Sequence, residues 1–265
     1  MQKKLCDLVI PSWFMKEHKG RYGSYESFYI ASECLNRILE ITPREKYNLI
    51  IIDNGSDLTD EDVKNESHIR FKPSWYWEQA DILIRNKENL GYGGGMNQGL
   101  ACTISDFVLI LNNDILFWDG WLEEILDTFN QGLKPEIGLA MPALEKSGRR
   151  FPEILNIKKE DVDMKTNSDK FGIHAQFGSC IAIRKEILET LYKNDGFYFD
   201  PQFKFLFKED RDLYQRIYRM GLESYRNHRV RVHHVGGVSV SKHKNKRDIS
   251  DDNKKKFEEK WKEKL

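Results

Sequence analysis

The first half of the chain alternates between apolar runs and amphipathic segments, a pattern that predicts strands and helices in turn. Apolar runs at residues 5–10, 48–52 and 107–111 each stop at polar or turn-forming residues, which is typical of parallel strands buried on both faces. Between the first two runs, apolar side chains recur at helical spacing from a cap at Ser24 to a stop at Pro43. This order favours an α/β fold with a mostly parallel sheet flanked by helices.

The same patterns extend over most of the chain. A charged segment without periodicity, residues 145–170, predicts a long loop or lid over one edge of the sheet. In the last predicted strand, Val230, Val232 and His234 share one face. The other predicted elements are strands at 82–84, 137–141, 178–183 and 229–234, a glycine-rich turn into a helix at 89–99, helices beginning at Asp119, Arg184 and Glu209, and an aromatic loop at 194–207.

Neither an internal repeat nor a linker interrupts these elements, so we predict a single domain over residues 1–265. A nucleotide-binding type of parallel sheet would occupy residues 1–145, a second half residues 146–241, and a charged helix residues 242–265. In that tail Phe257, Trp261 and Leu265 are spaced at four residues, which predicts a terminal helix docked on the body. A second interpretation is peripheral contact of this basic helix with a membrane.

Composition narrows the class of protein. Of 265 residues 40% are hydrophobic, enough for a packed core, and the 42 Lys and Arg balance the 42 Asp and Glu, so no overall field recruits nucleic acid. The four cysteines are far apart, which argues against a zinc knuckle or a disulfide framework. No segment is long and apolar enough to span a bilayer, and the apolar stretch near the start is too short for a signal peptide. We therefore expect a cytoplasmic protein, with the inner face of a membrane as its alternative site.

Two acidic segments are candidates for chemistry. Asp114 follows a buried strand, where it could take a hard divalent cation or simply form a strand-end turn. Glu209 and Asp210 open a helix after the aromatic loop, so either could act as a general base in a partly desolvated pocket, or both could serve only the helix dipole. Asp212 and Arg216 are expected to pair on the surface.

Two further segments could complete a site. Residues 89–99 fit neither a dinucleotide fingerprint nor a phosphate loop, because Met96 and Leu100 stand where those motifs need Gly and Lys. The segment could still let a ligand lie against backbone, with Asn97 bonding it, or it could be a structural glycine turn. His234 could complete a metal site begun by Asp114, or lie in the core.

Taken in order, these segments resemble the motifs of the family-2 glycosyltransferases, GT-A enzymes that use nucleotide-sugar donors. The resemblance covers nearly the whole chain, points to the rhamnosyltransferase-like branch, and implies a GT-A fold with a smaller acceptor-side subregion. The matching segments are the strand into Pro11 and Ser12, DNGSD at 53–57, NLGYGGGMN at 89–97, LNND at 111–114, GSCIAIRKE at 178–186, EDRDLYQRIYRMG at 209–221 and HHVGGVS at 233–239.

The resemblance implies a role for each matching position. Asp114 would carry Mn²⁺ or Mg²⁺ as the last residue of a DxD-type motif, His234 would reach the metal or the diphosphate, and Asp210 would be the catalytic base, with Glu209 as its competitor. Residues on the acceptor side would be Gly178, Ser179 and Trp118. Residues that hold or line the donor would be Pro11, Ser12, Asp53, Asn89, Gly91, Gly95, Asn97, Asn112 and Asn113.

The chain departs from the family pattern at two places. The usual DxD motif has become Asn112, Asn113 and Asp114, so only one carboxylate can bind metal there. The first strand also leads into a longer polar loop than the family leads us to expect.

The implied activity is inverting transfer of a sugar from a UDP- or dTDP-linked donor to a hydroxyl of a glycan or lipid-linked glycan, as in polysaccharide biosynthesis. One alternative is a nucleotidyltransferase that makes the nucleotide sugar, but the glycine- and arginine-rich loop expected after its first strand is missing. The other is a noncatalytic carbohydrate-binding protein, in which Trp75, Tyr76 and Trp77 would stack on sugar rings. Such a protein would not need Asp114 together with Asp210.

Overall fold

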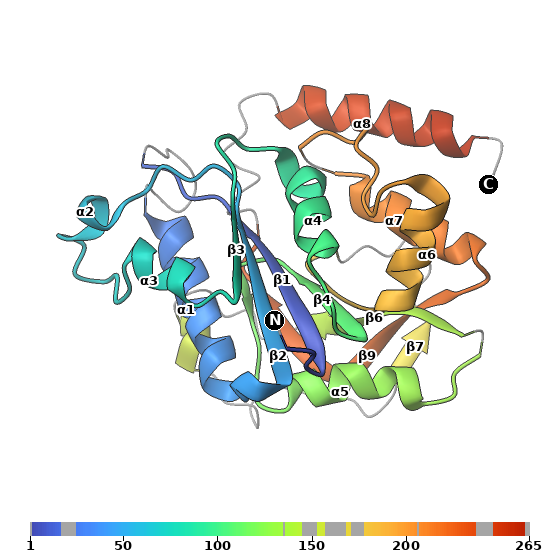
Figure 1. Cartoon of the computed structure of the whole chain (residues 1–265), viewed down its shortest axis with the longest axis horizontal. Coiled ribbons are helices and arrows are strands. Elements are labelled where there is room, and N and C mark those ends of the chain that lie inside the picture. The colour runs from blue at the N-terminus through green and yellow to red at the C-terminus, as the bar shows by residue number, and fades with distance from the viewer. Residues whose placement is uncertain are drawn as a thin grey trace.

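The computed structural model describes residues 2–16, 25–134, 136–144, 153–156, 168–170, 178–205, 207–236 and 246–262. Within these ranges the strands are β1 (Cys6–Ser12), β2 (Tyr47–Asp53), β3 (Ile82–Arg85), β4 (Phe107–Leu111), β5 (Ile115–Leu116), β6 (Ile137–Leu144), β7 (Ser168–Lys170), β8 (Cys180–Arg184) and β9 (Glu223–His234). The helices are α1 (Glu26–Ile41), α2 (Asp60–Val63), α3 (Pro73–Glu78), α4 (Gly91–Ala101), α5 (Trp121–Asp127), α6 (Lys185–Asp195), α7 (Glu209–Arg219) and α8 (Lys246–Trp261), with 3₁₀ turns at Arg44–Lys46, Thr128–Asn130 and Glu153–Asn156 (Figure 1).

The strands described form one sheet in the order β3-β2-β1-β4-β8-β6-β9-β5, and β7 pairs with β9. Neighbours from β3 to β4 are parallel, whereas β8 runs antiparallel to both β4 and β6. β6 and β9 are again parallel. The predicted α/β fold with a mostly parallel sheet is therefore confirmed, and its antiparallel pairs all involve β8 or β9.

Successive side chains of the central strands point to opposite faces of the sheet and pack into two separate hydrophobic cores. One contains Leu8 and Leu109, and it is covered by apolar residues of α1 and α5. The other contains Val9 and Val108, on the opposite side of the same strands, and it is covered by α4, α6 and α7. Burial on both faces explains why these strands read as continuous apolar runs in the sequence.

Helix α4 shows why its segment is so rich in glycine. The glycines lie inside the helix and not in a turn before it, which corrects the expected glycine-rich turn. A Cβ at Gly99 would stand 2.6 Å from Ile52 Cδ1 and 2.6 Å from Val9 Cγ1, and one at Gly95 would meet the side chain of Asn54. The missing side chains therefore let this helix approach the sheet closely.

The sequence predicted that these helices exist, but it predicted their first residues less accurately. The residue before α5 is Gly120 with φ of 78°, so the helix begins after Gly120 and Asp119 is not its cap. Tyr25 precedes α1, and the predicted cap Ser24 lies outside the described residues. The last strand is also longer than expected, because β9 begins at Glu223 and shifts register between Asn227 and Arg231, where a bulge interrupts its pairing with β6.

The pair of Asp212 and Arg216 forms as predicted but is not on the surface. Arg216 Nε donates to Asp212 Oδ2 at 2.9 Å, and the two residues are 6% and 0% exposed. Asp212 is covered by α8, where Trp261 Nε1 donates to Asp212 Oδ1 at 3.1 Å and Lys260 lies 2.6 Å from the same oxygen. The sequence could not reveal this cover, since α8 is mostly charged.

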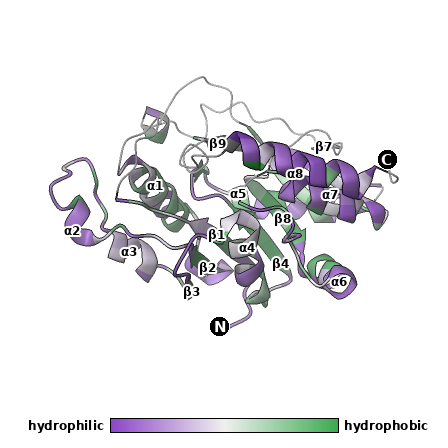
Figure 2. Ribbon diagram, turned by 90° about the horizontal axis from the view of Figure 1, so that it is seen from above, coloured by the Kyte–Doolittle hydropathy of each residue, from purple (hydrophilic) through white to green (hydrophobic). Residues whose placement is uncertain are grey.

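Helix α8 lies along α7, and Figure 2 shows it as mostly hydrophilic. Trp261 is 3% exposed and Phe257 packs near Phe203 with ring centroids 6.4 Å apart, so the predicted docking of the tail on the body is confirmed for these two residues. The third residue of that pattern, Leu265, lies outside the described residues. Most of the predicted lid at 145–170 also lies outside them. In the described part of the chain, no helix combines the length and apolar character needed to cross a membrane.

Candidate active site

The short strand β5 brings Asp114 and His234 together. β5 runs antiparallel to the end of β9, with Ile115 opposite His234, so Asp114 faces the end of β9. His234 Nε2 lies 3.1 Å from Asp114 Oδ1, and the backbone N–H of Gly236 donates to Asp114 Oδ2 at 3.1 Å. Asp114 is only 5% exposed. The carboxylate predicted from the sequence is thus rigidly held beside the predicted histidine.

Asp114 also affects the charge of His234. Burial by itself would lower the pKa of His234, but attraction to the Asp114 carboxylate and the hydrogen bond between them together raise this pKa above its ordinary value of 6.5. The Asp114 carboxylate, held beside His234, would attract a metal cation in the same way as it attracts the proton of this imidazole.

The side chains of Asp114 and His234 suit a divalent cation. A carboxylate oxygen and an imidazole nitrogen are both ligands for Mn²⁺ or Mg²⁺. Their separation of 3.1 Å is close to the spacing of neighbouring ligands around an octahedral ion with bonds of about 2.1 Å. In the described residues no cluster of three or more His, Cys, Asp or Glu could hold a metal. The residues therefore fit a cation whose other ligands come from a bound substrate.

Ser12 and Asp53 lie at the carboxyl ends of β1 and β2, next to each other in the parallel register. Ser12 Oγ is 2.8 Å from Tyr76 Oη, and Asn113 Nδ2 donates to Ser12 Oγ at 3.4 Å. Arg85 donates to Asp53 Oδ2 at 3.2 Å. The predicted donor-side residues Ser12, Asp53 and Asn113 therefore meet at one edge of the sheet.

The backbones of Pro11 and Asn112 lie at the same edge of the sheet. Pro11 is opposite Ile52 in the register of β1 and β2, and the N–H of Asn112 donates to Ser179 O at 2.8 Å. The contacts of Tyr76 and Arg85 were not predicted. Arg85 could have been found, because it ends β3 directly opposite Asp53.

Asn54 holds the loop that leads into α4. Its Nδ2 donates to Asn89 Oδ1 and to Gly91 O, each at 3.0 Å, while its Oδ1 accepts from the N–H of Leu90 at 3.1 Å. Asn89 Oδ1 in turn accepts from the N–H of Gly91 at 2.8 Å. This network fixes the start of the helix, where the sequence predicted donor contacts at Asn89, Gly91 and Gly95.

Asn97 has structural partners on the loop before α7. Asn97 Nδ2 donates to Phe199 O at 2.8 Å, and the N–H of Phe199 donates to Asn97 Oδ1 at 2.7 Å. Both ends of the amide are therefore bonded to the loop. A donor-binding role for Asn97 stays a prediction, and the contacts seen here tie α4 to the loop instead.

Glu209 and Asp210 open α7, directly after a loop with unusual backbone angles. Phe205, Phe207 and Lys208 have positive φ of 60°, 70° and 77°, a region that non-glycine residues rarely adopt. Such angles cluster at functional sites, where the surrounding structure has to hold them.

The two carboxyl groups have different surroundings. Glu209 is 8% exposed, and its Oε2 has no hydrogen-bond partner among the described residues. Burial and the neighbouring charge of Asp210 raise the pKa of Glu209 to about 8. Asp210 is half-buried, accepts at Oδ1 from the N–H of Arg211 at 2.7 Å, and has a pKa raised by burial. Asp210 is therefore the more accessible carboxylate.

Gly178 lies against Asp210. A Cβ at Gly178 would come 2.8 Å from Asp210 Oδ2, so any side chain at this position would crowd this oxygen. Ser179 is 3% exposed, and its Oγ has no partner among the described residues. Trp118, the third predicted acceptor-side residue, is 6% exposed and follows β5. Only Gly178 of the three is thus seen in contact with a catalytic candidate.

Tyr92 links the two acidic centres and was missed in the sequence. Burial raises its pKa well above 10, and the charges of Glu209, Asp210 and Asp114 raise it further, so the phenol lies within electrostatic reach of both centres. Its Oη is buried and has no hydrogen-bond partner among the described residues. Nothing in the local pattern of α4 distinguishes this tyrosine from a core residue.

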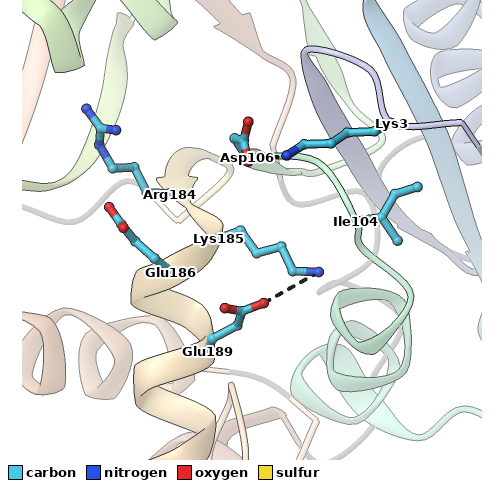
Figure 3. A pocket seen from close by; sticks show the side chains of 7 residues that line it. All are labelled: Lys3, Ile104, Asp106, Arg184, Lys185, Glu186 and Glu189. Atoms are coloured by element: carbon cyan, nitrogen blue, oxygen red, sulfur yellow. Dashed lines mark ion pairs between the residues drawn. The ribbon is translucent and has the colours of Figure 1, made fainter.

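A separate polar cleft of approximately 520 Å³ lies at the opposite edge of the sheet, lined by Lys3, Ile104, Asp106, Arg184, Lys185, Glu186 and Glu189 (Figure 3). Four of its charges form two ion pairs, with Lys3 2.8 Å from Asp106 and Lys185 3.8 Å from Glu189. Ligands of open α/β sheets bind at the carboxyl ends of parallel strands, and this cleft is at the amino ends of β1 and β4. The chemistry therefore belongs to the edge that carries Asp114 and Asp210.

Comparison with known proteins gives one family and several related folds. The family model described as Glycosyl transferase family 2 matches residues 26–192. Among solved structures, the chain is similar to GalNAc-T7 with UDP, GalNAc and Mn²⁺, with a TM-score of 0.59 and 15% identity over 86% of this chain and 42% of that one. It is also similar to S. aureus TarS 1-349, with a TM-score of 0.53 and 14% identity over 85% of this chain and 60% of that one.

The TarS fragment in complex with UDP is matched equally well, with a TM-score of 0.53 and 15% identity over 85% of this chain and 60% of that one. The chain thus spans from 42% to 60% of the length of these solved structures. At such low identities the likeness concerns the fold, which is of the GT-A type. None of the curated proteins searched matches the chain.

Proposed function

The chain belongs to glycosyl transferase family 2, and from this premise we propose that it is an inverting glycosyltransferase. The donor is a UDP- or dTDP-linked sugar, and the acceptor is a hydroxyl of a glycan or lipid-linked glycan. The rhamnosyltransferase-like branch is part of this proposal.

One observation carries the proposal. Two acidic centres lie at the carboxyl edge of the sheet, because Asp114 follows β4 and Asp210 lies against Gly178, two residues before the strand β8 that pairs with the end of β4. Asp114 and His234 suit a cation, whereas Asp210 is a half-buried carboxylate. Sugar transfer from a nucleotide sugar needs both features. The anomeric carbon of the donor must lose the nucleoside diphosphate, and the acceptor oxygen that bonds to it must lose its proton.

The step follows from these positions. Asp210 accepts the proton of the acceptor hydroxyl, whose oxygen forms a bond to the anomeric carbon of the donor. The bond from that carbon to the diphosphate breaks on the opposite face, and its electron pair leaves with the nucleoside diphosphate. The anomeric configuration is therefore inverted.

Other residues bind and orient the donor. Asp114 and His234 would hold Mn²⁺ or Mg²⁺, which when bound supplies positive charge to the departing diphosphate. Asp53, fixed by Arg85, would hold the base or ribose, and the start of α4 lies beside it through the Asn54 network. The Arg85 guanidinium also lies over Trp77, 5.4 Å from the ring centroid, which keeps this end of the site rigid.

A panel of UDP- and dTDP-sugars tests the proposal. The melting temperature is measured with each donor, with and without Mn²⁺, and the stabilising donors are then incubated with glycan acceptors. We expect nucleoside diphosphate to form together with a glycosidic bond of inverted configuration, read by NMR. A retained configuration would contradict the inverting step, and formation of a nucleotide sugar from a sugar phosphate would favour the nucleotidyltransferase.

A further inference from the structure

The charged C-terminal helix α8 contacts the loop that precedes the candidate base. Asn253 is 0% exposed although most of its neighbours in α8 are charged. Its Nδ2 donates to Lys204 O at 2.9 Å and to Phe207 O at 3.2 Å. A fully buried amide in an otherwise polar helix is costly unless it is bonded, and its donor side is used on the backbone of this loop.

The same loop is where the backbone is strained. Phe205, Phe207 and Lys208 all have positive φ, and Lys208 is the residue immediately before α7. Non-glycine residues adopt such angles at an energetic cost, so the loop keeps this shape only if other contacts hold it. The direction in which α7 starts, and with it the position of Asp210, depends on these angles.

Contacts hold the loop from two sides. On the side of α4, Gly91 approaches the backbone of Phe205 so closely that a Cβ would be 2.6 Å from its Cα, and the N–H of Tyr92 donates to Phe205 O at 3.1 Å. On the other side is α8, where Lys256 Nζ donates to Gln202 O at 3.2 Å. The loop is therefore held between α4, the helix at the proposed donor site, and α8. We call this pair of contacts the clamp.

A second set of bonds from α8 reaches the same region. Lys260 Nζ lies 2.6 Å from Asp200 Oδ2 and 2.6 Å from Asp212 Oδ1, so it joins the loop to α7. Figure 2 shows α8 running beside α7. The helix therefore contacts both the strained loop and the helix that carries Asp210.

We propose that Asn253 is a positioning residue of the transfer reaction, which holds the backbone of Lys204 and Phe207 in the shape that directs Asp210 toward the acceptor. The inference rests on the proposed function. It gives α8 a role in catalysis although no residue of α8 is proposed to touch the substrate. A displacement of about 1 Å in a catalytic group can cost about 10²-fold in rate, so loss of this clamp should be visible in kcat.

Asn253→Asp tests the proposal, because the carboxylate has nearly the same shape but cannot donate to the two carbonyls. Lys255→Ala is the matched control, since Lys255 is exposed on the same helix. Below the melting temperature of the variant, we expect kcat to fall about 10²-fold while the Kd for UDP with Mn²⁺ stays within about twofold of wild type. The control should retain both values. Asn253→Ala, which adds no buried charge and favours helix, is the second variant if Asn253→Asp does not fold.

Hydrogen exchange of the amides at 203–211 separates this proposal from the proposed function. We expect faster exchange there in the Asn253 variants, even in a protein that transfers no sugar. Unchanged exchange would overturn the proposal, as would faster exchange with an unchanged kcat, or equal losses of kcat and UDP affinity. A wild-type protein that transfers no sugar from any donor would overturn the proposed function, while the exchange result would still decide whether Asn253 holds the loop.

Discussion

Asp210 and Glu209 are neighbours in sequence, but the fold gives their carboxyl groups different surroundings. Asp210 is half-buried and lies against Gly178, whereas Glu209 is buried and its Oε2 has no hydrogen-bond partner among the described residues. We expect Asp210→Asn to keep donor binding and to lower kcat by roughly 10²-fold or more, because an amide cannot accept the proton of the acceptor. Single-turnover transfer and UDP titration measure the two quantities separately.

Glu209→Gln is the control for this prediction. Because burial and the neighbouring charge of Asp210 raise the pKa of Glu209 to about 8 and so favour its neutral form at pH 7, its amide variant should transfer sugar at a rate near that of wild type. If Asp210→Asn transferred normally while Glu209→Gln were inactive, the base would be Glu209.

The raised pKa of Glu209 also predicts how stability depends on pH. Glu209 binds its proton more tightly in the folded state, with a pKa of about 8 against an ordinary 4.5. Its contribution to stability is therefore complete below pH 4.5 and is lost as the pH rises toward about 8. Glu209→Gln, which cannot ionise, should match wild type near pH 5 and melt several degrees higher near pH 9. A difference in melting temperature that does not change with pH would refute this.

His234 and His233 provide a test of the cation site. His234 Nε2 lies 3.1 Å from Asp114 Oδ1, and successive side chains of a strand such as β9 point to opposite faces, so His233 is its matched neighbour. We expect His234→Ala to weaken metal-dependent UDP binding by about 10- to 100-fold with little change in the melting temperature of the free protein. His233→Ala should leave binding largely intact. Equal effects of both variants would return His234 to a structural role.

The sequence identified side chains whose chemistry shows in the local pattern. Asp114 follows a buried strand and Asp210 follows an aromatic loop, so both could be named without a structure. Tyr92 and Asn253 could not be named, because their importance depends on which distant segments they meet. The exchange of hydrogen bonds between Asn97 and Phe199 spans 102 positions and has no local signature.

At the scale of elements, the packing of α4 on the sheet gives a prediction about stability. Gly99→Ala would place a methyl group 2.6 Å from two core side chains, Ile52 and Val9. Overpacking of this kind costs typically about 1–3 kcal/mol, so the variant should unfold at lower denaturant concentration.

Gly94→Ala is the matched control in the same helix. Its new Cβ would meet only Leu90, at 3.0 Å, and Leu90 is 43% exposed and can move. Since alanine favours helix over glycine, this variant should be as stable as wild type or slightly more stable. Equal destabilisation by both changes would mean that helix α4 does not depend on close approach at Gly99.

Strands were predicted well because burial on both faces leaves a continuous apolar run. β4 was predicted at its observed bounds, and β2 within one residue at each end. The extension of β9 back to Glu223 was missed, since its residues pair with β6 and β7 through the backbone and include polar side chains. The docking of α8 was predicted from Phe257 and Trp261, but its contact with α7 was missed, because the spacing of apolar residues in a helix does not name its partner.

At the scale of the whole molecule, the sheet connects residues that are far apart in sequence into one edge. Asp53 ends β2, Asp114 lies between β4 and β5, and Asp210 lies in the first turn of α7, so the three stand on both sides of the order reversal between β1 and β4. A ligand that touches all three would join the half with β1–β4 to the half with α7 and β9. Binding should then stabilise the chain as a unit against unfolding.

This linkage predicts a common effect of metal removal and of Asp114→Ala. A donor at 100 times its Kd should stabilise the wild-type protein by about 2.7 kcal/mol, which raises the melting temperature by several degrees. With His234 the only other protein ligand named for the cation, EDTA and Asp114→Ala should each remove most of this shift for UDP, while leaving the melting temperature of the free protein nearly unchanged. Differential scanning fluorimetry with UDP, with and without Mn²⁺, measures it. An undiminished shift in EDTA would mean that Asn112, Asn113 and nearby basic side chains hold the diphosphate without a metal.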